Sequence, residues 1–227
     1  MSLCKIFLAS VLMTATVTSA MAEEYGTWND NSAIGSLVVN DQVNLKTNWS
    51  NLSGVVDTVG GDVVAQGAAA GNIMDVITMD NTRVFNNQIV SSQATIGSNV
   101  SLDANNVWGS VGVNNTSLYN GASVSTDPVL TSVNSYQECG AKDPYTGTSA
   151  FVTNIAGNAV FQNSAISNSF EGDSNAPNFP VFNKQINNSS AISNIAVNAF
   201  NVGGTVGLSS SAISNTSRVI HYNTGGQ

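Results

Sequence analysis

The feature that most constrains this chain is a set of residues that recurs at intervals close to 48 positions. One column consists of the glutamines Gln42, Gln88, Gln137 and Gln185, whose numbers step by 46, 49 and 48. A second column consists of Gly60, Gly109, Gly157 and Gly204, and a third of Gly71, Asn120, Asn168 and Asn215. The step from the second column to the third is constant, and so is the step from the third column to the next glutamine, so all variation in length falls between glutamine and glycine. This spacing indicates tandem duplication of a unit with one tolerant loop; chance matching in an Asn-, Ser- and Gly-rich sequence is the alternative.

Apolar and polar residues alternate along the chain in the segments that contain these columns. Val111 and Val113 correspond to Val206 and Leu208 in the last unit, and Gly and Asn mark the ends of the alternating segments. Period-two alternation is typical of half-buried β-strands, and Asn and Gly tolerate left-handed backbone at corners. A strand-and-turn unit of this size buries its apolar face by stacking on the next unit. The sequence therefore predicts an all-β fold, a β-solenoid of four tandem units rather than a β-sandwich.

Stacking places each residue above its equivalent, about 4.8 Å away. Like charges in such a column repel, whereas Val, Ser and Asn columns are favourable. Charged residues make up only 9% of the chain, against about 25% in an ordinary soluble domain. We therefore expect a self-stacking coil with Asn and Gln ladders on its outside or at its corners. The C-terminal segment RVIHYNTGGQ does not resemble a charged, proline-rich cap, and uncapped ends predict end-to-end growth.

The pentapeptide SAISN occurs three times, at residues 164–168, 190–194 and 211–215. The first and third copies occupy the same place in successive units. The middle copy lies between them, close to half a unit from each. This spacing favours a unit that is itself built from two coils of about 24 residues.

Residues 1–22 have the pattern of a signal peptide, with Lys5, an apolar segment at 6–17 and the motif AMA ending at Ala22. We expect cleavage after Ala22, a lead-in or cap at 23–38, the β-repeat domain at 39–220 and a C-terminal tail at 221–227. Export removes Lys5 and leaves five basic and 14 acidic residues, a net charge of −9. This charge argues against nucleic acid or anionic lipid as a partner, and no later segment has the length and apolarity of a transmembrane helix. Cys139 then remains as a lone cysteine, expected as a half-buried free thiol, with an intermolecular bridge as the alternative.

Residues with catalytic or metal-binding chemistry are few. His221 is the only histidine and is expected as a solvated tail residue, so no Ser-His-Asp arrangement can be built. Asp75 and Asp80 are a conceivable carboxylate pair, but a solvated turn is the simpler interpretation. A single His and Cys exclude a cluster of such ligands, and the calcium pattern GGxGxD is matched only in part, at 59–64. We expect no enzymatic activity, no cofactor and no metal.

Repeat segments such as QATIGSNVSLDANNVWGSVGV and AAAGN give the chain a resemblance to exported alphaproteobacterial surface proteins with Asn-, Ala- and Gly-rich repeats. These include the holdfast attachment proteins of stalked bacteria, and more broadly the chain is similar to curlins, which form functional amyloid. The Gln-Gly-Asn spacing of curlins is not reproduced here. The resemblance implies a fibre subunit or adhesin anchor that passes the periplasm to the outer surface of a Gram-negative bacterium and acts in biofilm.

Three functions follow from the sequence. The first is a self-assembling adhesive subunit that contacts itself and other surface or outer-membrane anchor proteins. The second is a monomeric solenoid that binds extracellular polysaccharide, since Trp28, Trp49 and Trp108 could stack on sugar rings, although packing at coil edges is the simpler role for them. The third, less favoured, is a carbohydrate-active enzyme on a β-helix.

Overall fold

The computed structural model describes residues 35–127, 129–140 and 142–222. The expected signal peptide with Ala22, most of the lead-in, and Trp28 lie outside these residues. The described residues form twelve β-strands and no helix. The strands are β1 Ser36–Asn44, β2 Asn48–Val59, β3 Val63–Thr78, β4 Thr82–Val90, β5 Ile96–Val107, β6 Val111–Thr126, β7 Thr131–Cys139, β8 Tyr145–Ile155, β9 Ala159–Ser174, β10 Val181–Asn187, β11 Ile192–Val202 and β12 Val206–His221.

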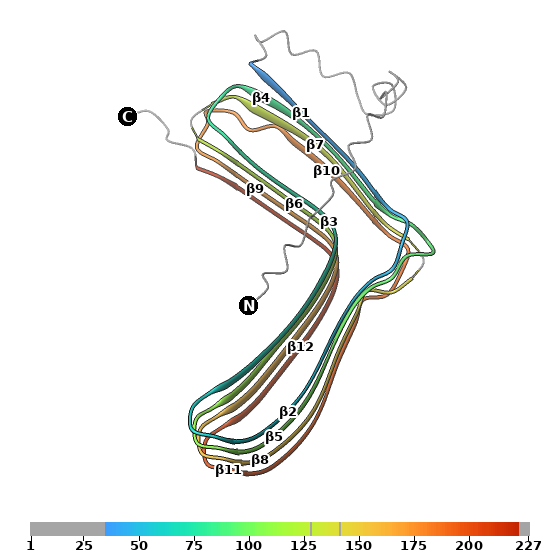
Figure 1. Cartoon of the computed structure of the whole chain (residues 1–227). Helices are drawn as coiled ribbons and strands as arrows, with labels where there is room; N and C mark the ends of the chain where they lie inside the picture. Colours follow the sequence, from blue (N-terminus) through green and yellow to red (C-terminus); the bar gives the residue numbers. More distant parts are fainter. Residues whose placement is uncertain (1–34, 128, 141, 223–227) are drawn as a thin grey trace, which may run out of the picture. The chain divides into compact units, whose positions relative to one another are not determined.

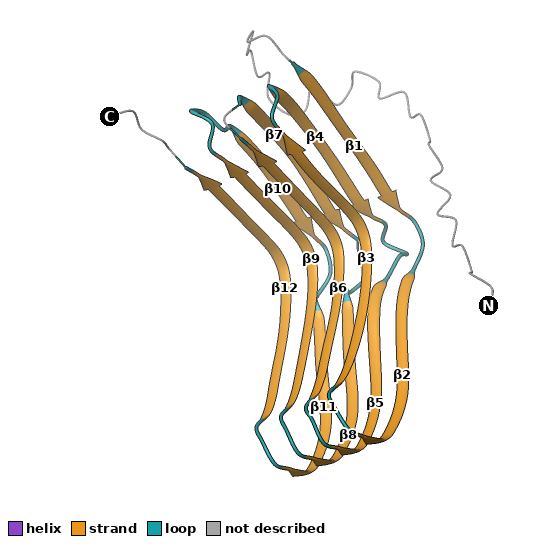
Figure 2. Ribbon diagram, turned by 60° about the vertical axis from the view of Figure 1, so that its left-hand side comes forward, coloured by secondary structure: helices purple, strands orange, loops and turns teal. Residues whose placement is uncertain are grey.

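The strands form three parallel four-stranded sheets, which confirms the predicted all-β solenoid. Sheet A has the order β1-β4-β7-β10, sheet B the order β2-β5-β8-β11 and sheet C the order β3-β6-β9-β12. Three consecutive strands therefore make one coil, and the next coil lies directly beside it (Figures 1 and 2). Equivalent valines of the four units are paired in register, with Val38 beside Val84, Val84 beside Val133 and Val133 beside Val181.

The interpretation of each unit as two shorter coils is wrong. Strands pair with their equivalents one whole unit away throughout, as in Gln42 with Gln88 and Thr82 with Thr131. The SAISN copies at 164–168 and 211–215 lie side by side in β9 and β12. The middle copy at 190–194 instead spans the start of β11, in another sheet, so its half-unit spacing has no structural counterpart.

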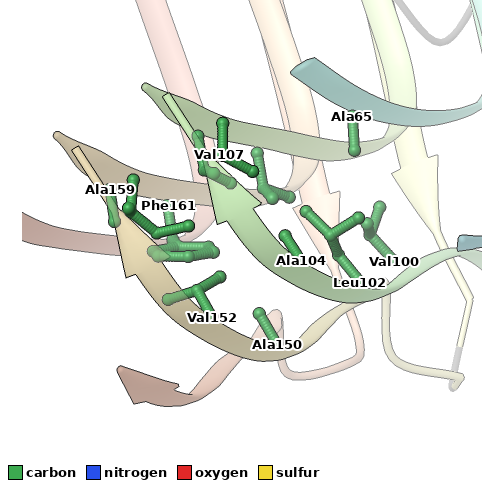
Figure 3. Close-up of a cluster of buried hydrophobic side chains, with 12 residues drawn as sticks. Ala65, Val100, Leu102, Ala104, Val107, Ala150, Val152, Ala159 and Phe161 are labelled. Carbon is green, nitrogen blue, oxygen red and sulfur yellow. The ribbon is translucent and has the colours of Figure 1, made fainter. Parts of the chain in front are cut away.

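Sheet C is the longest of the three, with 16 residues in each strand. Its strands bend near their middle, so that sheet B covers their first half and sheet A their second half (Figure 2). The core between sheets B and C contains Val100, Leu102 and Phe161, all at most 5% exposed (Figure 3). A second core between sheets A and C contains Val84 and Phe170. A smaller third cluster contains Ile96, Tyr119 and Cys139, from the start of β5, the middle of β6 and the end of β7.

The turns between sheets B and C form a column of glycines, and three of them, Gly109, Gly157 and Gly204, have almost no room for a side chain. The amide of Gly157 donates to the carbonyl of Gly109, and the amide of Gly109 to the carbonyl of Gly61. A Cβ on Gly109 would lie 2.6 Å from the carbonyl carbon of Gly61. Spacing in the sequence assigns Gly60 to this column, but the structure has Gly61 there. Val59 pairs with Val107, so the residues two positions further on, Gly61 and Gly109, lie side by side.

The corner that ends each strand of sheet B requires left-handed backbone. Asn106, Asn154 and Asn201 have φ near 54°, and Thr58 occupies the same position in the first coil with φ 58°. Asn visits this region far more readily than a β-branched residue does. The asparagines at this corner also form a ladder of side-chain hydrogen bonds, because Asn154 donates to Asn106 over 3.0 Å and Asn201 donates to Asn154 over 2.8 Å.

We therefore expect Thr58→Asn to raise the free energy of unfolding by about 1 kcal/mol. The reciprocal change, Asn154→Thr, should lower it by a similar or larger amount, because it also breaks the ladder. Chemical denaturation of both variants measures this. A Thr58→Asn variant less stable than the parent would contradict a strained corner.

Candidate assembly surface

A ladder of glutamine side chains runs through the interior and ties sheet A to sheet C. The Nε2 groups of Gln88, Gln137 and Gln185 donate to the Oε1 of the glutamine in the preceding coil, over 3.2, 2.9 and 2.8 Å. Each also donates to a carbonyl of sheet C, as Gln137 does to Ser169 over 2.9 Å. Gln88 and Gln137 are 0% exposed, so the expectation that this ladder decorates the outside is wrong.

A second ladder, of asparagines, runs beside the first and ties sheet C back to sheet A. Asn72 donates to Asn120, Asn120 to Asn168 and Asn168 to Asn215, over 2.8 to 2.9 Å. Asn120 also donates to the carbonyl of Glu138 in sheet A over 2.9 Å. Spacing in the sequence assigns Gly71 to this column; the structure places Asn72 there.

These ladders satisfy buried polar groups at the bend of sheet C, where the two cores meet. An unpaired buried amide costs about 1–3 kcal/mol, whereas a paired amide is stabilising. Each amide needs a partner from the coil before it and from the coil after it. The interior is therefore complete only where a coil has neighbours on both sides.

The last coil has no described neighbour on its outer side. Val206 and Leu208 point inward in β12 but are 43% and 59% exposed. Their equivalents in the preceding coil, Ala159 and Phe161, are 0% exposed. Inward-facing apolar groups are thus open to solvent only because the stack ends there. We call the surface formed by β10, β11 and β12 on this side the C-terminal face.

Strand edges add to this surface. Each of β10, β11 and β12 is the last strand of its sheet, so each presents a row of main-chain donors and acceptors to a further strand. In β12 that row extends over 16 residues without a proline. Long unprotected edges of this kind are templates for pairing with another chain.

Two basic side chains of the last coil contact their register partners in the preceding coil. Arg218 in β12 lies 2.6 Å from Glu171 in β9, and the two residues are direct register partners. Lys184 in β10 lies over the ring of its register partner Tyr136, 5.4 Å from the ring centre. A charged residue is thus tolerated in a column where its register partner is an opposite charge or an aromatic ring.

The residues considered for catalysis are placed in structural roles. Asp80 accepts hydrogen bonds from Ser36 and from the amide of Asn81, which orders the turn before β4. Asp75 lies on the exposed face of β3. His221 is the last residue of β12 rather than a tail residue, and its Nε2 lies 2.5 Å from the carbonyl of Ala176. A carbonyl only accepts, so Nε2 carries the proton. Among the described residues, no three His, Cys, Asp or Glu side chains form a group suited to a metal ion.

The described tryptophans do not form one platform. Trp49 stacks on Tyr145 across Gly97, with ring centres 5.9 Å apart and planes 13° apart. Trp108 follows β5 at the other end of sheet B and is 75% exposed. Packing between coils therefore accounts for Trp49, and Trp108 stands at a turn.

Cys139 is fully buried, not half-buried as expected, and lies at the bend beside the asparagine ladder. Burial raises the pKa of its thiol to about 11, and the Ser189 hydroxyl lies 3.1 Å from the sulfur. The thiolate is the reactive form. This environment makes Cys139 a packing residue in the folded chain.

We expect folded protein to resist alkylation of Cys139 at pH 8 and to react once unfolded, as mass spectrometry after iodoacetamide treatment would show. The thiol of an unfolded chain ionises at about pH 8.5. Since the folded pKa is higher, stability should fall as the pH rises from about 8.5 to 11. Rapid labelling of the native protein would contradict this placement.

Comparison with protein-family models, curated proteins and solved structures finds no match. Within the described part of the chain, no helix is long and apolar enough to cross a membrane. The resemblance to holdfast attachment proteins and curlins therefore stays a prediction from sequence.

Proposed function

We propose that this protein is an exported structural subunit that assembles end to end through its coils and contributes to adhesion at the cell surface. The observation that carries the proposal is the C-terminal face, where inward-facing apolar side chains, ladder ends and three strand edges are all open. The signal-peptide pattern and the low charge of the chain support export and stacking.

Stacking a further coil on this face would complete the interior. It would bury Leu208 as Phe161 is buried, and it would give the edge strands their missing partners. Equivalent side chains would then continue as cross-strand neighbours, which is favourable for the Val, Ser and Asn columns. The contact would have the same chemistry as the contacts between coils inside one chain.

The proposal is tested by replacing one apolar residue on the face and one beside it. Leu208→Glu places a carboxylate where the next coil would cover it, which is costly for assembly. The matched control is Phe182→Glu, because Phe182 is 40% exposed in the same coil but points outward. Its column begins at the uncharged Val39 in the first coil. Residues 23–227 of each protein are diluted from denaturant at micromolar concentration, and polymer is followed by sedimentation and negative-stain electron microscopy.

We expect fibres from the parent and from Phe182→Glu, and folded monomers from Leu208→Glu, with circular dichroism verifying the fold. Compact monomers of the parent at every concentration would contradict self-assembly. Equal assembly of both variants would show that the C-terminal face is not the contact.

A further inference from the structure

The charges at the two ends of the stack are opposite in sign. Strands β1, β2 and β3 of the first coil contain three acidic residues, Asp41, Asp57 and Asp75, and no basic residue. Strands β10, β11 and β12 of the last coil contain two basic residues, Lys184 and Arg218, and no acidic residue. Complementary charge of this kind selects one way of joining two copies over another.

The opposite charges also share columns. Register pairing leads from Asp41 through Asn87 and Tyr136 to Lys184. It leads in the same way from Asp75 through Ser123 and Glu171 to Arg218. If the first coil of one copy continued the stack of another, Asp41 would lie beside Lys184 and Asp75 beside Arg218. Opposite charges at directly opposed strand positions are favourable, and like charges are not.

The inward-facing residues of the end strands match each other as well. In β1 these residues are Val38, Asn40, Gln42 and Asn44, and in β10 they are Val181, Asn183, Gln185 and Asn187. The inner strands differ at the last of these positions, which is Val90 in β4 and Cys139 in β7. The first and last coils thus agree with each other more closely there than with the coils between them.

The two amide ladders run in opposite directions, which gives each end a distinct pair of groups. Glutamine amides donate toward the first coil, and asparagine amides donate toward the last. On the last coil, Gln185 presents Oε1 as an acceptor and Asn215 presents Nδ2 as a donor. On the first coil, Gln42 has a second Nε2 hydrogen beyond the one donated to Ile73, and Asn72 presents Oδ1. Each group at one end therefore has its complement in the same column at the other end.

We propose that copies of this chain join head to tail, with the first coil of one copy on the C-terminal face of another, in the register of the coils within one chain. This inference rests on the proposed self-assembly and specifies its polarity. Gln42 donates to Gln185 and Asn215 donates to Asn72 across the junction. A tail-to-tail contact would instead bring two sets of basic residues together and would reverse the order of the sheets around the coil.

Charge reversal tests the polarity through rescue. Asp41→Lys with Asp75→Lys gives both charged columns a basic residue at each end, and Lys184→Glu with Arg218→Glu gives both columns an acidic residue at each end. Each double variant alone should need about tenfold or more protein to polymerise, because two favourable pairs become repulsive. An equimolar mixture should polymerise within about twofold of the parent concentration, since every junction in an alternating stack is again complementary.

Cysteine cross-linking identifies the joined residues independently. Ser53 and Ala196 are small, exposed and in the same outward column of sheet B, at its first and last positions. Adjacent strands place such positions about 4.8 Å apart, within the range of a disulfide. In a Cys139→Ser background, mixed Ser53→Cys and Ala196→Cys proteins should give the mixed dimer on oxidation.

The outcomes separate this inference from the proposed function. If the parent does not polymerise, self-assembly itself fails, and the polarity with it. If the parent polymerises but the double variants assemble alone as well as the parent, or the mixture is not rescued, the head-to-tail contact is wrong. Dimers of Ala196→Cys with itself would assign a tail-to-tail contact instead.

Discussion

Asn120→Asp should lower the free energy of unfolding at pH 7 by about 3 kcal/mol or more, which would leave the folded state marginal. Asn120 is 0% exposed, and its Nδ2 donates to the carbonyl of Glu138 and to Oδ1 of Asn168. Aspartate still accepts from Asn72, but it directs a charged oxygen at two oxygens that now lack a donor. An uncompensated buried charge is among the most destabilising single changes.

The pH dependence of this variant follows from the same burial. Desolvation raises the pKa of a buried carboxyl above the value of about 3.9 in the unfolded chain. The loss of stability should therefore be smallest below about pH 4 and should grow as the pH rises through the folded pKa. The matched control is Asn198→Asp on the exposed face of β11, expected within about 0.5 kcal/mol of the parent. Urea denaturation of both variants at pH 4 and 7 measures these free energies of unfolding. Equal stability of the two variants at pH 7 would contradict a buried asparagine ladder.

Gly157→Ala should lower the free energy of unfolding by about 2 kcal/mol. A Cβ at this position would lie 2.8 Å from the carbonyl oxygen and 2.9 Å from the carbonyl carbon of Gly109, and would also clash with Oγ of Ser110. Since Gly109 itself is held between neighbouring turns, the backbone cannot yield without breaking the stack. The control is Gly112→Ala, because a Cβ on Gly112 would meet no atom within 4 Å. Thermal unfolding should show a clear loss for Gly157→Ala and almost none for Gly112→Ala; equal losses would contradict close stacking of the turns.

Spacing in the sequence predicted the solenoid and the glutamine column, because the glutamines stand in similar segments, VNDQV, FNNQI and FNKQI, in three of the four units. It shifted the other two columns by one position in the first unit. The turn there contains two adjacent glycines, Gly60 and Gly61, and spacing alone does not say which of them matches Gly109. Gly71 was likewise chosen over Asn72, which lies beside it. In the structure, the pairing of Val59 with Val107 places Gly61 beside Gly109, and Asn72 pairs directly with Asn120.

The position of the ladders was predicted less well. Gln and Asn are usually exposed, so the sequence favoured an outward decoration. The interior accepts them because carbonyls of sheet C lie within reach of the glutamine amides, as Ser169 does for Gln137, and carbonyls of sheet A lie within reach of the asparagine amides, as Glu138 does for Asn120. That bend depends on how two sheets pack on one long sheet, which no local pattern in the sequence specifies. The column that joins Asp41 to Lys184 could be recognised only once the strand register was known, beginning with the pairing of Asp41 with Asn87.

The most direct test of end-to-end assembly is the axial repeat of a fibre made from residues 23–227. The last coil of one copy and the first coil of the next should be separated by one strand spacing, as coils within a chain are. Four coils then give a subunit repeat of about 19 Å along the fibre, together with a meridional reflection at about 4.8 Å. Fibre diffraction and electron cryomicroscopy measure both quantities. A subunit repeat equal to four strand spacings is the expected result; a clearly longer repeat, or monomers without fibres, would contradict assembly by continuous stacking of coils.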